Sequence, residues 1–167
     1  MKRLIFSLAV IMVLGAVPAW AQIAKKQGVK SDKPGTAMLL ESESKFDFKE
    51  TVEMLKLEAE KKTWKISGTH DLQQSLKVSG TDVLPVTVLA ICHPKHSGKV
   101  LTLDDERIVS TLMPCRISVY QKSNGKTYIS RLNSSTVAES FSGIISQVIT
   151  EAGADIEEII APLIVVK

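Results

Sequence analysis

Residues 84–94, LPVTVLAICHP, and residues 112–120, LMPCRISVY, decide the fold of this chain. Residues 86–92 are almost wholly apolar and rich in β-branched side chains, which predicts a strand buried on both faces. Residues 115–121 alternate between apolar and polar side chains, which predicts a half-buried strand. The two cysteines of the chain, Cys92 and Cys115, end the first strand and begin the second. If these strands are antiparallel neighbours, the cysteines meet at one edge of the sheet.

Three further strands are predicted around this pair. Residues 37–42 form a short apolar run, and residues 63–70 alternate so that Trp64 and His70 lie on the same side. Residues 127–132 form the last strand, which returns after Asn124-Gly125, a strong signal for a tight hairpin. Because a tight turn joins only antiparallel strands, the sheet is predicted to be mostly antiparallel.

Two long amphipathic helices are predicted to flank these strands. The first begins at an Asp47 cap and carries apolar side chains at helical spacing, namely Phe48, Val52, Leu55 and Ala59. The second is predicted to begin at a capping box of Thr136 and Glu139 and to end at Gly153. Asp104 is predicted to cap a short helix before residue 113. Two helices that bury one side against a sheet predict a two-layer α+β domain of order β-α-β-β-β-β-α.

The N-terminus has the pattern of a secretory signal peptide. Lys2 and Arg3 precede the uncharged residues 4–17, and Ala19 and Ala21 supply an A-x-A cleavage site. The apolar run is shorter than the about 20 residues that a membrane span needs. The sequence therefore predicts a signal peptide at residues 1–21, a disordered leader at 22–36 and one domain at 37–167. The protein is expected to be exported, periplasmic or extracellular, without membrane attachment after signal removal.

Charge and motifs narrow the classes of function. Without Lys2 and Arg3, the basic side chains fall from 21 to 19, against 18 acidic ones, and aromatic residues make up 5% of the chain. This balance does not favour nucleic acid as a partner. There is no G-x-S-x-G nucleophile motif and no CxxC or HxxxH motif for a metal. The sequence favours a binding protein over an enzyme, and it leaves the oligomeric state open.

Residues 48–133 resemble the family called domain of unknown function 302. The resemblance rests on the strand of Trp64, on HDLQQSL from residue 70, on ICHP and MPCRISVY around the two cysteines, and on GKTYISRLN from residue 125. It implies a β-α-β-β-β-β-α fold similar to the TATA-binding-protein-like folds. The family has no agreed biochemical activity, so the resemblance implies architecture and no function.

Cys92 and Cys115 are predicted to form a disulfide or a thiol site. Export favours oxidation, and neighbouring antiparallel strands place Cα atoms about 4.5–5.5 Å apart, which suits a disulfide. Such a bond is worth about 3 kcal/mol when it closes a loop of this length. Alternatively, the free thiols could exchange electrons, with Arg116 as the adjacent cation.

The same edge also carries possible metal ligands. Thiolate, imidazole and thioether groups suit copper, and thiolate with imidazole suits zinc; the candidates are Cys92, Cys115, His93, His96, His70 and Met113. No cofactor is expected otherwise. Arg131 is predicted to lie towards the apolar side of its strand, where it either pairs with Asp71 or Asp82 or contacts an anion or a partner. Arg116 is the second candidate for contact with an anion or a partner. We therefore expect a module that binds a small ligand or a protein at this edge, with thiol-redox or soft-metal handling as the alternative.

Overall fold

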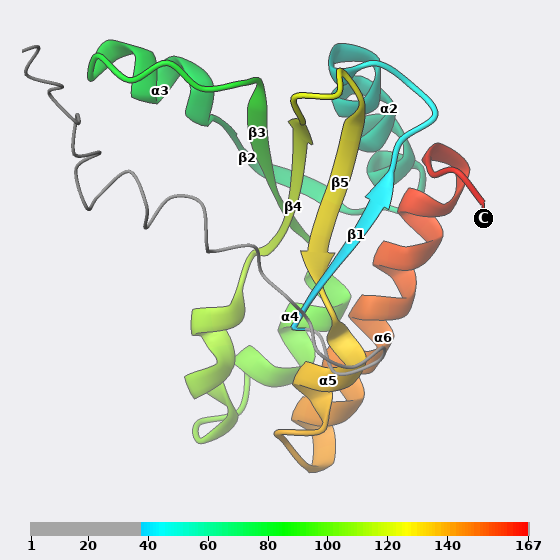
Figure 1. The fold of residues 1–167 in the computed structure, drawn as a ribbon. Helices are drawn as coiled ribbons and strands as arrows, with labels where there is room; N and C mark the ends of the chain where they lie inside the picture. Colours follow the sequence, from blue (N-terminus) through cyan, green and yellow to red (C-terminus); the bar gives the residue numbers. More distant parts are fainter. Residues whose placement is uncertain (1–37, 167) are drawn as a thin grey trace, which may run out of the picture. The chain divides into compact units, whose positions relative to one another are not determined.

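The computed structural model describes residues 38–166, and the expected signal peptide and leader lie outside this range. One five-stranded antiparallel sheet, of order β1-β5-β4-β3-β2, forms the centre of the domain (Figure 1). Its strands are β1 Leu39–Glu43, β2 Lys65–Asp71, β3 Val86–Cys92, β4 Cys115–Gln121 and β5 Thr127–Leu132. The sequence predicted all five strands, and the α+β fold class is confirmed.

Helices fill the connections and follow the last strand. They are α2 Phe48–Lys61, α3 Leu72–Val78, α4 Pro94–Leu101, the 3-10 helix η1 Glu106–Leu112, α5 Ser134–Ala138, α6 Gly143–Ile160 and the 3-10 helix η2 Ala161–Leu163. Asp47 caps α2 as expected, since its Oδ1 accepts a hydrogen bond from the Glu50 N–H at 2.9 Å. Within the described residues, no helix is long and apolar enough to span a membrane.

The main core lies between α2, α6 and one face of the sheet. Leu55 and Ala59 of α2 are fully buried there, as are Ile159 and Ile160 of α6. The sheet contributes alternate side chains to the same cluster, namely Leu89, Ile91, Ile117, Val119 and Ile129. Both long helices therefore cover one face of the sheet, as predicted. This core also fixes the position of the end of the sheet where β3 ends and β4 begins.

The predicted limits of the last helix are wrong at both ends. Thr136 lies inside the short helix α5, which stops at Ala138, and α6 begins only at Gly143, whose φ is +59°. The helix also continues through Gly153 to Ile160. A Cβ atom on Gly153 would lie 2.2 Å from the Cβ of Ser134. Gly153 is therefore required for the close approach of α5 and α6, and it does not end the helix.

Two other local predictions fail for identifiable reasons. The register of β2 shifts between Ile66 and Gly68, so that Ile66 lies opposite Ile91 while His70 lies opposite Val88. Such a bulge turns the later side chains to the other face, and His70 is therefore not on the side of Trp64. Asp104 does not cap a helix, because its carboxylate pairs with Arg107 at 2.9 Å.

Candidate functional site

The two cysteines lie at the same end of the sheet, where strand β3 ends and its neighbour β4 begins, but they do not face each other. Strands β3 and β4 are antiparallel neighbours, and Cys115 lies opposite Ile91 rather than opposite Cys92. This offset of one residue directs the two side chains to different faces of the sheet, because successive side chains alternate. Both cysteines are free thiols in this structure.

A pocket opens at this edge, and both cysteines line it. Its cavity has a volume of about 90 Å³ and lies among residues from β3, α4, η1, β4, β5, α5 and α6. Most of the lining is apolar, and it includes Val100, Val109, Met113, Ile145, Val148 and Ile149. Val100, Val109 and Val148 form a second small core with partly buried neighbours. The pocket therefore lies between this second core and the end of the sheet.

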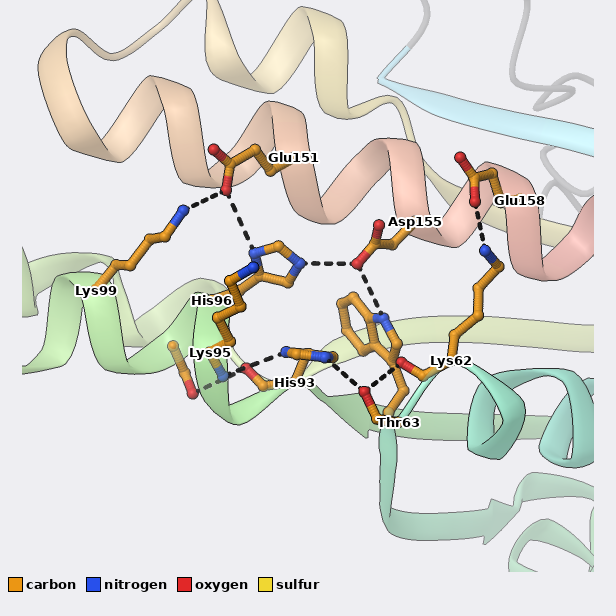
Figure 2. A network of polar contacts seen from close by, with 11 residues as sticks. Lys62, Thr63, His93, Lys95, His96, Lys99, Glu151, Asp155 and Glu158 are labelled. Atoms are coloured by element: carbon orange, nitrogen blue, oxygen red, sulfur yellow. Dashed lines mark hydrogen bonds and ion pairs between the residues drawn. The ribbon is translucent and has the colours of Figure 1, made fainter.

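An aromatic and polar cluster of Trp64, His93, His96 and Asp155 borders the pocket. Figure 2 shows His93, His96 and Asp155 of this cluster. The rings of His93 and His96 lie 4.9 Å apart, and each lies within 6 Å of the Trp64 ring. Asp155 of α6 accepts hydrogen bonds from the Trp64 Nε1 at 3.3 Å and the His96 Nε2 at 2.8 Å. This carboxylate thus fixes α6 to α4 and to the start of β2.

His96 lies between two carboxylates of α6 (Figure 2). Its Nε2 contacts Asp155, whereas its Nδ1 lies 3.6 Å from the Glu151 Oε2, too far for a hydrogen bond. Glu151 is instead bound by Lys99 of α4 at 2.6 Å. Among the described residues, the His96 Nδ1 is the one buried side-chain nitrogen or oxygen without a hydrogen bond. Since buried polar groups are normally paired, a ligand or a water molecule in the adjoining pocket would satisfy it.

A model of the family described as "Domain of unknown function DUF302" matches residues 40–163. The chain belongs to this family. A similar solved structure, "Crystal structure of uncharacterized conserved protein DUF302 from Bacillus stearothermophilus", has a TM-score of 0.67 and 18% identity, and the match covers 74% of this chain and 96% of that one. At this identity the similarity shows a shared fold. No curated protein matches the chain.

Burial determines the protonation state of one thiol of this DUF302 domain, that of Cys115. Burial, with a smaller contribution from the nearby Cys92, raises the pKa of the Cys115 thiol to about 11. Cys115 is therefore a neutral thiol at physiological pH, whereas metal binding and disulfide exchange require a thiolate. The Cys92 Sγ donates a weak hydrogen bond to the Ser97 Oγ at 3.7 Å. Within residues 38–166, no three His, Cys, Asp or Glu side chains are grouped to hold a metal ion.

The structure brings most of the predicted site residues together. Besides the cysteines, the pocket is lined by His93, His96, Met113, Arg116 and Arg131. His70 lies elsewhere, on the other side of the bulge in β2 and opposite Val88. Arg131 is buried, and its partner is Glu157 of α6 rather than Asp71 or Asp82.

Sequence reasoning missed the acidic half of the polar cluster. The sequence patterns place neither Glu151 nor Asp155 in the site, although their spacing of four residues puts both on one face of a helix. That spacing was the available signal. It was hidden because the helix was expected to end at Gly153, between the two carboxylates.

His93 should make the stability of the domain sensitive to mild acid. Burial, together with the nearby His96, lowers the pKa of His93 below its ordinary value of 6.5. Just below pH 6.5 the unfolded chain binds a proton at His93 that the folded chain does not bind. The contribution of His93 to the free energy of unfolding is therefore complete above pH 6.5 and decreases as the pH falls below it. His93 also caps α4, because its Nδ1 accepts a hydrogen bond from the Lys95 N–H at 3.2 Å.

We expect His93→Asn to flatten the decline in free energy of unfolding between about pH 6.5 and 5, because asparagine keeps a capping oxygen but does not titrate. The measurement is urea unfolding at a series of pH values, with the comparison at pH 8 as the control for the cap. An equally steep decline in the variant would show that His93 does not cause the pH dependence.

Proposed function

We propose that this protein is an exported DUF302 domain that binds a small, mainly apolar molecule in the pocket beside Cys92 and Cys115. The observation that carries the proposal is a preformed apolar cavity of about 90 Å³ with a small number of polar groups at its border. Pockets of this composition are typical binding sites for small molecules. Export rests on the signal-peptide pattern of residues 1–21.

The walls of this pocket are held in place independently of any ligand. Trp64 is 1% exposed and Val100 is fully buried. Two contacts connect α4 to α6 on one side of the pocket: the hydrogen bond of His96 to Asp155 and the ion pair of Lys99 with Glu151. A site whose walls are already ordered loses little conformational freedom on binding, which favours affinity for a small ligand.

The alternative is a thiol-redox or soft-metal protein that uses the same cysteines. The neutral state of Cys115 and the offset of the two side chains across the sheet both favour ligand binding over this alternative. A metal would also have to compete for His93, whose Nε2 lies 2.9 Å from the Thr63 Oγ1 and whose Nδ1 caps α4.

Protection of the thiols tests ligand binding directly. Since Cys92 and Cys115 line the pocket, 1-hexanol should slow their reaction with a small neutral thiol reagent in a saturable way. In Ile149→Phe, the larger ring should fill the pocket and reduce the effect of hexanol. Leu57→Phe is the matched control, since Leu57 is an exposed side chain of α2 outside the pocket.

Labelling rates that do not change with hexanol would contradict the proposal. The same experiment addresses the alternative, because counting the free thiols of the isolated protein before and after reduction shows whether a disulfide forms. Copper or zinc that copurifies in a one-to-one ratio and is lost when Cys92 is replaced by Ser would favour metal handling instead.

A further inference from the structure

We propose that the ligand of this pocket is an anionic amphiphile, namely a short apolar chain or ring that carries one carboxylate or similar group, and that Arg116 binds this group. The inference rests on the proposed function and specifies the class of ligand. Three observations support it: the positive sign of the charged side chains that line the pocket, the lack of a partner within residues 38–166 for one of them, Arg116, and the size of the cavity.

Among residues 38–166, the side chains of permanent charge that line the pocket are both basic, namely Arg116 and Arg131, and no aspartate or glutamate of this range contributes to the lining. Asp155 and Glu151 contact His96 but do not line the cavity. An apolar pocket with positive charge at its border is complementary to a ligand with an apolar body and a negative head.

The charge of Arg131 is already neutralised. Its guanidinium donates to both carboxylate oxygens of Glu157, at 2.9 and 2.6 Å, and to the Ser42 Oγ at 2.8 Å. These three bonds occupy all three nitrogens of a side chain that is 7% exposed. Arg131 therefore has little capacity to bind a further anion.

Arg116 differs from Arg131 on each of these points. It is the second residue of β4 and is exposed, opposite Ala90 and on the same face of the sheet as Cys92. Within the described part of the chain, its guanidinium has neither a hydrogen bond nor an ion pair. A guanidinium can bind a carboxylate through two parallel hydrogen bonds. Arg116 is thus the cation at the border of the pocket that is available to a ligand.

The size of the cavity limits the apolar part of the ligand. A volume of about 90 Å³ is smaller than the roughly 150 Å³ of a dry protein cavity that takes up benzene. The apolar part must therefore be short, and the head group must lie towards the exposed side of the pocket, where Arg116 is found. Hexanoate and its neutral analogue hexanamide are suitable probes, because they differ in charge and are nearly equal in size.

Trp64 can report binding of these probes. The chain contains two tryptophans, Trp20 and Trp64, so the full chain with Trp20→Phe emits from Trp64 alone, which lines the pocket. We expect hexanoate to bind about tenfold more tightly than hexanamide, as one charge-assisted hydrogen bond implies. Arg116→Gln should remove this preference without weakening hexanamide, and Arg116→Lys should keep part of it. Lys49→Gln is the control, since it removes an exposed positive charge of α2 outside the pocket.

The possible outcomes separate the two proposals. Preferential binding of hexanoate that is lost in Arg116→Gln, kept in Lys49→Gln and weakened by salt supports the inference. Equal binding of hexanoate and hexanamide, with no effect of Arg116→Gln, overturns the anionic ligand and leaves the apolar pocket as a binding site. Failure of both probes to change the emission of Trp64 or the thiol labelling overturns the inference together with the proposed function.

Discussion

Replacing Glu157 by alanine should lower the free energy of unfolding by about 3 kcal/mol, the scale for removing one partner of a buried ion pair. The cause is Arg131, whose side chain is 7% exposed and which depends on Glu157 for its counter-charge. In Glu157→Ala, the buried guanidinium keeps only its bond to the Ser42 Oγ. A buried charge without a partner is strongly destabilising.

The pair should respond asymmetrically to mutation. Glu157 is 47% exposed, so it can be hydrated when Arg131 is replaced. We therefore expect Arg131→Met to cost only about 1 kcal/mol, since it removes the buried charge and keeps a similar apolar volume. The neighbouring Glu158, which pairs with Lys62 at the surface, is the control, and Glu158→Ala should change stability by less than about 1 kcal/mol. Urea unfolding measures all three variants, and an Arg131→Met variant less stable than Glu157→Ala would refute the asymmetry.

Gly153→Ala should lower the free energy of unfolding by about 2 kcal/mol, although alanine is the better helix former by about 1 kcal/mol. The added Cβ would lie 2.2 Å from the Cβ and 2.3 Å from the Oγ of Ser134. Helices α5 and α6 must then separate, and the pocket wall that both helices form moves with them.

A second substitution identifies the contact responsible. Ser134→Gly removes the Cβ and Oγ atoms and leaves the Cα atom at 3.7 Å, an ordinary contact distance, so it should restore much of the stability of Gly153→Ala. Ser134→Ala keeps the Cβ and should not. Gly98 of α4 is the control, because a Cβ atom at this position would meet no described atom within 4 Å outside its chain neighbours and the backbone of its own helix. Gly98→Ala should therefore stabilise the protein by up to about 1 kcal/mol. Thermal and urea unfolding would contradict this account if Gly153→Ala and Gly98→Ala stabilised the protein equally.

The strands could be predicted from the sequence because their signals are local. Residues 86–92 and 115–121 have clear strand patterns, and Asn124-Gly125 fixes a hairpin between β4 and β5. These local patterns alone place Cys92 and Cys115 at the same end of two neighbouring strands. The relation between the two thiols could not be predicted in this way, because a register offset of one residue depends on the packing of the whole sheet.

The position of the two acidic residues of the site, Glu151 and Asp155, depends on tertiary structure and is not predictable from local patterns. Gly153 has the sequence signature of a helix end, and only the contact with Ser134 of another helix shows why a glycine is needed in mid-helix. Because α6 continues through Gly153, Glu151 and Asp155 lie on one continuous helix facing His96. The bulge in β2, which turns His70 away, likewise has no clear signal beyond Gly68.

Binding of a small apolar molecule in this pocket is tested most directly by the methyl NMR spectrum of the full chain during titration with 1-hexanol. We expect saturable shifts of the methyl groups of Ile145, Val148 and Ile149, which line the pocket, and no shifts of Leu55 and Ile129 in the main core. A spectrum in which the three pocket residues do not shift at saturating hexanol, or shift no more than the core residues, would contradict it.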